Sequence, residues 1–206
     1  MENNESQKTQ TEEMAPVVNT QGRRSFLQKA TAGALIATIP AKSVWATGLT
    51  NSIVASGHGS DFAGGMQMHL KDFHFWTTNI SHVPDAKYTD IFGGRIIKNA
   101  SKQTFDSQAN RNKTLVEVLT ELNVNNKLKF RGPQNINLEL IAVYLNAKFS
   151  GMHGINFPVV GMTGKPYTSA EALAQGMYGT AMNMGGSPTL LAGELAMLNT
   201  NNFAML

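Results

Sequence analysis

The sequence contains no cysteine among its 206 residues. This absence excludes disulfide bonds, metal sites with cysteine ligands, c-type haem attachment and thiol nucleophiles. The net charge is also small, because 17 basic and 14 acidic residues leave only +3. This excess of positive charge is too small and too scattered for a nucleic-acid interface. No apolar run reaches the roughly 20 residues of a membrane-spanning helix. We therefore expect no nucleic-acid partner, no stable membrane span and no bound cofactor.

The N-terminal region has the pattern of an export signal. Residues 1–22 are polar and predicted to be disordered. Next come Arg23 and Arg24, a Ser-Phe-Leu sequence that includes Phe26 and Leu27, a weakly apolar run and small residues that favour cleavage after Ala46. Residues 23–46 thus resemble a twin-arginine (Tat) signal peptide. The alternative, a chance arginine pair before a buried or spanning helix, is disfavoured because the apolar run ends at Pro40.

A Tat signal predicts that the protein folds before export and that its first partner is the Tat translocase. The processed protein is then expected in the periplasm or at the cell surface. Residues 47–65 are rich in glycine and serine and are predicted to form a flexible leader. Residues 66–206 are predicted to form a single domain.

The domain is predicted to be mainly α, small and irregular, with about four to five helices and long loops. The predicted helices cover residues 66–76, 114–122, 138–149, 168–177 and 187–198. The period of the first segment also fits a strand, because large apolar residues alternate at its start. A turn is predicted at Gly93–Gly94, a surface loop over 99–112, and an edge segment or packed loop over 155–160.

The predicted helix boundaries depend on local capping patterns. Thr114 and Glu117 have the spacing of a capping box. Asn135 or Asn137 is expected to cap the next helix. The segment Thr168-Ser169-Ala170-Glu171 is expected to cap the one after it, which should end at Gly179.

Apolar spacing predicts which face of each helix is buried. The helices predicted over 114–122 and 138–149 are expected to pack as a pair. The first of them should bury its apolar residues as far as Leu122. In the second, a single stripe is predicted at Leu138, Ile141, Ala142, Leu145 and Phe149.

The last predicted helix begins at Ser187–Pro188, because proline at the first helical position loses no hydrogen bond. Its apolar face is predicted to consist of Leu190, Leu191, Leu195 and Leu198.

Three histidines are the candidate metal ligands. His69, His74 and His82, with His58 upstream, supply imidazoles that suit zinc, copper, nickel or iron. The spacing of five between His69 and His74 puts them on different faces of a helix, which weakens this interpretation. The alternative is a set of loop and partly buried histidines beside aromatic residues.

The carboxylates and methionines have structural interpretations. Glu117 and Glu121 flank a cap and are expected to form a solvated face, while Glu139 and Glu171 lie in first helical turns. Glu194 stands among leucines, and exposure is favoured over a buried carboxylate with a raised pKa. For the methionines at 177, 182 and 184, packing is favoured over a partner-binding surface or copper(I) ligation.

Four segments occur in an order that resembles a family of secreted bacterial proteins. The segments are Leu70-Lys71-Asp72-Phe73-His74-Phe75-Trp76, Ile91-Phe92-Gly93-Gly94, Thr114-Leu115-Val116-Glu117-Val118-Leu119 and Glu139-Leu140-Ile141-Ala142-Val143-Tyr144-Leu145-Asn146-Ala147. The family has a Gly-Tyr-Trp-Lys-Asn-His motif, which is degenerate here, and a helix ending in Ala-Leu-Leu-Asn-Ala. The resemblance implies an envelope or surface-exposed domain of unknown function, with no catalytic residues to carry over.

Three functions are compatible with these observations. The favoured hypothesis is an exported, non-enzymatic interaction or structural domain. The second is a small accessory subunit co-exported with a periplasmic oxidoreductase, since cofactor-loaded enzymes leave the cytoplasm folded. The third is a metal-binding protein that uses the candidate histidines.

Overall fold

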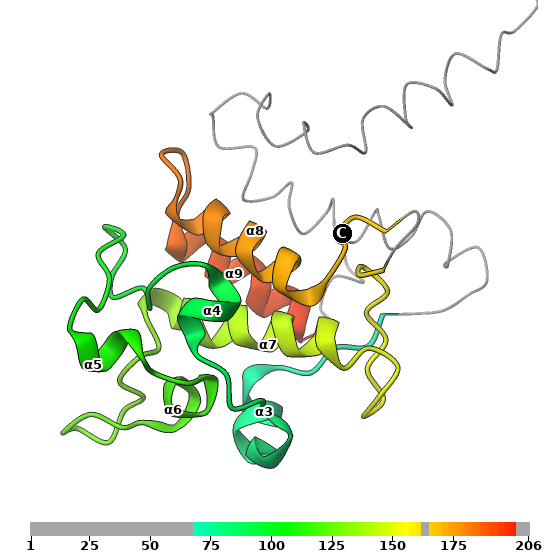
Figure 1. Cartoon of the computed structure of the whole chain (residues 1–206), viewed down its shortest axis with the longest axis horizontal. Coiled ribbons are helices and arrows are strands. Elements are labelled where there is room, and N and C mark those ends of the chain that lie inside the picture. The colour runs from blue at the N-terminus through cyan, green and yellow to red at the C-terminus, as the bar shows by residue number, and fades with distance from the viewer. Residues whose placement is uncertain (1–67, 162–164, 201–206) are drawn as a thin grey trace, which may run out of the picture. The chain divides into compact units, whose positions relative to one another are not determined.

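One buried helix, α7, forms the centre of the fold in the computed structural model, which describes residues 68–161 and 165–200 (Figure 1). Helix α7 spans Ile136–Lys148, and every residue from Ile136 to Ala147 is buried. The single apolar stripe predicted for this segment is therefore wrong, because α3, α6, α8 and α9 all contact α7. A helix surrounded in this way is apolar on all sides, apart from polar residues whose hydrogen bonds are satisfied.

Two long helices cover one side of α7. They are α8, Ala170–Met182, and α9, Pro188–Asn199. Figure 1 shows α8 and α9 on one side of α7, with α3 and α6 on the other. Ser187 caps α9 with Pro188 in its first turn, as predicted, and Ser169, within the predicted capping segment, caps α8. The predicted end of α8 at Gly179 is wrong, since the helix continues for three more residues.

Short helices make up the rest of the described chain. The α-helices are α3 (Phe73–Thr78), α4 (Tyr88–Phe92), α5 (Gln108–Arg111) and α6 (Leu115–Thr120), and the 3-10 helices are η2 (Ile80–His82) and η3 (Pro133–Asn135). The pairings between extended segments in the described chain are isolated bridges. The mainly α class is thus confirmed, with seven α-helices in residues 68–161 and 165–200. The excess over the expected four to five comes from helices of four to six residues.

The segment before α3 shows why the sequence period was ambiguous. His69 forms an antiparallel bridge with Asn156, through backbone hydrogen bonds of 3.1 and 2.8 Å. Asp72 then accepts a hydrogen bond from the Phe75 backbone and caps α3. The chain is therefore extended at His69 and helical from Phe73, so the helix predicted over 66–76 begins late.

Helix α6 confirms the predicted capping box but ends earlier than expected. The Thr114 hydroxyl accepts from the Glu117 backbone, and the Glu117 carboxylate accepts from the Thr114 backbone. The helix ends at Thr120, so Leu122 lies beyond it and is half-exposed. Helices α6 and α7 are in contact, as expected for consecutive helices.

Asn135 occupies the predicted N-cap position of α7 but makes no capping hydrogen bond, and Asn137 is not a cap. The backbone of Asn135 is left-handed at this position. Asn137 lies inside the helix and is fully buried. Its amide is used for tertiary contacts, described below, because a buried amide must satisfy its hydrogen bonds.

The loops lie largely where they are predicted. Gly93 ends α4 in the left-handed conformation at φ 68°, which glycine adopts without strain. Gly94 packs so closely on the Tyr178 ring that a Cβ would lie 2.1 Å from it. Residues 99–112 lie mostly at the surface, although they include α5. Residues 155–160 form a packed loop that buries Ile155, Phe157 and Val159.

Across the described ranges 68–161 and 165–200, no helix has the length and apolar character to cross a membrane.

Candidate functional site

The predicted export residues lie outside the described part of the chain. They are Arg23, Arg24, Phe26, Leu27 and the cleavage position Ala46. The same is true of His58. The signal peptide, its cleavage and the leader over 47–65 therefore stay predictions.

The three candidate histidines do not form one site. His69 lies in the bridge with Asn156, and the His74 ring lies 4.0 Å from the Phe73 ring, measured between centroids. The His82 ring instead lies 4.5 Å from that of His153. Within residues 68–161 and 165–200, no group of three or more His, Asp or Glu side chains is arranged to hold a metal ion. The described chain thus offers paired imidazoles and not a three-ligand centre.

His153 belongs to an aromatic cluster that sequence reasoning missed. Its ring is 5.7 Å from Phe149 and 6.5 Å from Trp76, both at edge-on angles. Trp76 is fully buried, and its indole N–H has no hydrogen-bond partner. His153 adopts a left-handed backbone at φ 52° in the turn after α7. The cluster holds this turn against α3. The one signal in the sequence that could have revealed it is the aromatic content of α3 and of the segment that follows α7.

The side chain of Asn137 joins α7 to three segments that precede it in the sequence. Its amide oxygen accepts from the Tyr88 hydroxyl at 3.0 Å and from the Ile97 backbone at 3.1 Å. Its amide nitrogen donates to the Ile97 and Phe130 carbonyls, each at 2.7 Å. All four hydrogen bonds are buried. Asn137 therefore fixes the position of the α4–α6 segment on α7.

A second polar cluster lies between α7 and α9. The Asn199 amide donates to the Glu139 carboxylate at 2.7 Å, and its oxygen accepts from Asn146 at 3.2 Å. Asn146 also exchanges two hydrogen bonds with the Lys71 backbone. Burial raises the pKa of Glu139 to about 7, against the hydrogen bond from Asn199, and the charge of Asp72 adds to the rise. The cluster aligns three segments and holds a carboxyl group that titrates near neutrality.

Glu194 is also buried, at 8% exposure, so the favoured prediction of an exposed side chain is wrong. It lies on α9 between Leu191 and Leu195, both of which face the core. Burial of the residues on both sides of Glu194 leaves it little access to solvent. The sequence pattern allowed this outcome but did not favour it.

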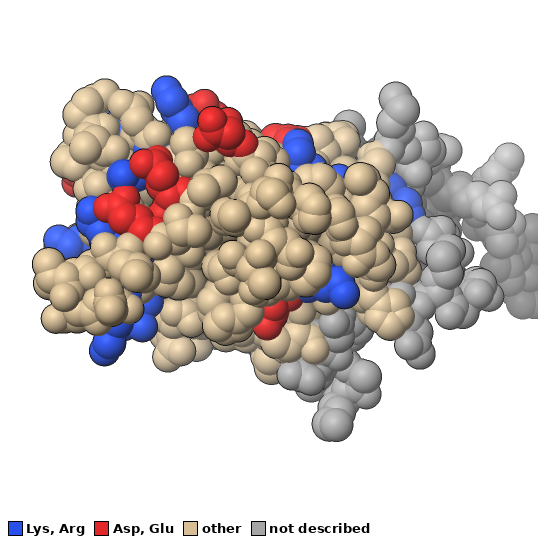
Figure 2. Space-filling view, turned by 90° about the horizontal axis from the view of Figure 1, so that it is seen from below, with Lys and Arg blue, Asp and Glu red and all other residues tan. Residues whose placement is uncertain are grey.

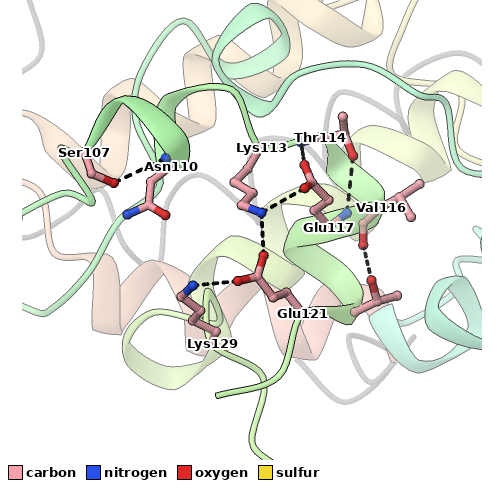
Figure 3. A network of polar contacts seen from close by, with 9 residues as sticks. Ser107, Asn110, Lys113, Thr114, Val116, Glu117, Glu121 and Lys129 are labelled. Atoms are coloured by element: carbon pink, nitrogen blue, oxygen red, sulfur yellow. Dashed lines mark hydrogen bonds and ion pairs between the residues drawn. The ribbon is translucent and has the colours of Figure 1, made fainter. Parts of the chain in front are cut away.

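An ionic network covers the outer face of α6 (Figure 3). Lys113 donates to Glu117 at 2.8 Å and to Glu121 at 2.6 Å, and Lys129 pairs with Glu121 from the other side. The hydrogen bonds from Lys113 hold the pKa values of Glu117 and Glu121 below their usual range. The expected solvated face is thus partly neutralised by lysines that follow and precede the helix. Because these charged side chains pair with one another, we interpret this surface as structural.

Helix α9 presents the candidate interaction surface. Leu190 is 59% exposed and Met197 is 51% exposed, with Gly193 exposed between them. These three residues, at spacings of three and four, share one side of the helix. We call them the α9 face. The prediction that Leu190 joins the buried leucines is therefore wrong, because α7 occupies the opposite side of α9.

The α8–α9 hairpin is itself poor in charged residues. From Ala170 to Thr200 the charged residues are Glu171 and Glu194. Met177 and Met182 pack as predicted, but Met184 is fully exposed, so its predicted packing is wrong. By contrast, charged side chains gather at the end of the molecule that holds α5 and α6, as Figure 2 shows.

No family model, no curated protein and no solved structure matches this chain. The resemblance to the Gly-Tyr-Trp-Lys-Asn-His proteins accordingly stays a prediction.

Proposed function

We propose that this chain is an exported, non-enzymatic interaction domain that works in the periplasm or at the cell surface. The single observation that carries the proposal is the α9 face. Leu190 and Met197 are held in solvent by a helix whose other side is anchored in the core. Large apolar side chains that are exposed on one side of a rigid helix can form part of a protein-binding surface.

The export part of the proposal rests on the Arg23–Arg24 pair. A protein that leaves the cytoplasm folded must form its core before transport. The described helices are capped locally at Asp72, Thr114, Ser169 and Ser187, which favours rapid formation of secondary structure. The cysteine-free composition is compatible with either redox compartment.

The proposal is tested by fractionation and by co-purification from the source organism. A tagged full chain should be recovered outside the cytoplasm, shortened by the signal peptide, together with a binding protein. Replacing Arg23→Lys and Arg24→Lys together should retain the chain in the cytoplasm. An unchanged location after this double replacement would overturn the export part.

The same co-purification separates the two interaction roles. A stable complex with a flavin or molybdenum enzyme would favour the accessory-subunit role over a stand-alone domain. The metal-binding role predicts stoichiometric metal in the purified protein that is lost in His74→Ala. Metal-free protein that still captures its partner would exclude that role and support the interaction domain.

A further inference from the structure

We propose that His82 and His153 form a copper(II) site with two protein ligands, at the surface beside the turn that follows α7. The proposal is independent of the interaction function and uses different residues. It also differs from the metal site predicted from the sequence, because the second ligand comes from a distant segment and not from His69 or His74.

Rigid parts of the fold hold the two imidazoles together. His82 is the last residue of η2, which directly follows α3. His153 lies in the turn after α7, and its ring contacts Phe149 and the fully buried Trp76 of α3. Helices α3 and α7 are themselves in contact. Both ligands are therefore positioned before a metal arrives, which lowers the entropy cost of binding.

The nitrogens of both rings are available to a ligand. His82 and His153 are exposed to solvent. Across the described ranges 68–161 and 165–200, no hydrogen bond or ion pair engages the ring nitrogens of either side chain. Imidazole nitrogens in this state are the commonest metal ligands in proteins.

The separation of the two rings fits coordination at a right angle. Metal–imidazole bonds of about 2.0–2.1 Å place the metal about 3.2 Å from each ring centroid, so two imidazoles at a right angle have centroids about 4.5 Å apart, and a tetrahedral pair about 5.2 Å apart. The centroids of His82 and His153 are 4.5 Å apart. The rings are tilted by 31° to each other. Rotation about the Cβ–Cγ bond, which is a broad torsion, turns each nitrogen towards a shared metal without moving the centroid.

This geometry favours copper(II) over zinc. Right-angled arrangements are typical of copper(II) and nickel(II), whereas zinc prefers tetrahedral sites. Of the divalent first-row metals, copper(II) is bound most tightly by a given set of nitrogen ligands. In the described part of the chain, no group of three or more His, Asp or Glu side chains is arranged around a metal. The remaining coordination positions are therefore left to water.

Trp76 provides a direct readout of copper at this site. The chain has two tryptophans, Trp45 and Trp76, so Trp45→Phe in the full chain leaves Trp76 as the sole indole. Copper(II) quenches the fluorescence of a nearby indole, and we expect copper sulfate to quench Trp76 along a saturating one-site curve. Trp76 is fully buried, which limits quenching by unbound copper. Quenching that is absent, or that rises without saturation, would overturn the proposal.

Variants of single histidines test which imidazoles bind. In the Trp45→Phe background, His82→Ala and His153→Asn should each weaken copper binding by more than about tenfold, since loss of an outer-shell partner alone costs about that much. Asparagine is used at position 153 because it tolerates the left-handed backbone found there, at φ 52°. His74→Ala is the matched control, because His74 is also exposed and lies only two residues before Trp76. Equal losses in all three variants, or no loss in any, would contradict the assignment.

Pulsed electron paramagnetic resonance counts the coordinated imidazoles independently of fluorescence. One equivalent of copper(II) on the unmodified full chain should give the signals of two imidazoles. Each of His82→Ala and His153→Asn should give at most one, with an unchanged circular dichroism spectrum because both side chains are exposed. Two imidazoles retained in both variants would show that other histidines bind the metal, and the proposed site would be wrong.

Failure of the copper site and failure of the proposed function give different results. If the chain binds no copper but co-purifies with another protein, the site is wrong and the interaction function stands. If the double arginine replacement leaves the location unchanged, the export function fails while the copper titration of the purified chain is unaffected.

Discussion

The α4–α6 region and the α8–α9 hairpin are built on the same central helix in opposite ways. Between Asp85 and Arg131 the sequence has 14 charged residues, whereas the hairpin from Ala170 to Asn199 has two. The first region is attached to α7 through the buried amide of Asn137. The hairpin is attached chiefly by apolar side chains, with Asn199 as a polar contact at its end.

The two regions also differ in what their surface side chains contact. Charged groups around α6 pair with one another, so that region is complete without a partner (Figure 3). The hairpin buries its leucines on one side but leaves Leu190 and Met197 in water on the other. With only two charged residues, the hairpin has no comparable network of paired side chains on its surface. The four predictions below test this contrast.

The largest effect is expected for Asn137→Ala, which detaches the charged region from α7. The truncation leaves the Ile97 amide and two carbonyls buried without partners. We expect the free energy of unfolding to fall by about 4 kcal/mol, at 1–3 kcal/mol for each unsatisfied group. Urea denaturation measures the loss. Tyr88→Phe removes one hydrogen bond and should cost only about 1 kcal/mol, so a similar loss in both variants would contradict the role assigned to Asn137.

Adjacent leucines in the hairpin test its two sides. Leu191 is buried and Leu190 is exposed, so Leu191→Ala should lower the free energy of unfolding by about 3 kcal/mol through loss of packing. Leu190→Ala should change it by less than about 0.5 kcal/mol. Both are measured by urea denaturation. Similar losses for the two variants would show that α9 is rotated from its described orientation.

The contribution of the Glu139–Asn199 contact to the free energy of unfolding is expected to depend on pH. The folded pKa of Glu139 is about 7 and its ordinary value is 4.5. The folded state therefore binds the proton more tightly, and the free energy of unfolding should fall as pH rises from about 4.5 to about 7.

Glu139→Gln should remove this loss while its amide oxygen still accepts from Asn199. The variant should then be more stable than the wild type at pH 8, by about 3 kcal/mol at most, with the advantage absent near pH 4. Denaturation curves at the two pH values measure this difference. An advantage that is the same at both would exclude Glu139 as the titrating group.

The smallest effect is expected in the ionic network of the charged region. Lys113→Met removes the cation shared by Glu117 and Glu121 and should cost about 1 kcal/mol, because ion pairs close to the surface contribute little. The loss should shrink in 1 M salt, where charges are screened within about 3 Å. Thermal denaturation with and without salt measures it. Lys127→Met, at an exposed position outside this network, should have no salt-dependent effect.

Helix starts were predictable because their signals are local. Thr114, Ser169 and Ser187 each accept from a backbone N–H within three residues, and this short contact depends on little else in the fold. Helix ends and exposed faces were harder to predict. Gly179 continues α8, and Leu190 lies opposite the leucines with which it was grouped. Both depend on which neighbour each helix contacts.

The candidate site was predicted less well than the fold. Spacing alone grouped His69, His74 and His82, but the chain pairs His82 with His153, which lies 71 residues further along. Asn137 was expected to cap a helix because asparagine is common in that position. Its burial depends on Tyr88, Ile97 and Phe130. No periodicity in the sequence records contacts over such separations.

The sequence by itself determined the helical class, the capped helix starts and a charge distribution that leaves the C-terminal hairpin nearly neutral. These properties follow from residue types and from contacts a few residues long. Only the tertiary structure decided that α7 is buried on all sides, that Glu139 and Glu194 leave solvent, and that Leu190 and Met197 remain in it. The physical reason is that burial depends on which helices surround a residue, and the packing of the whole domain sets those neighbours.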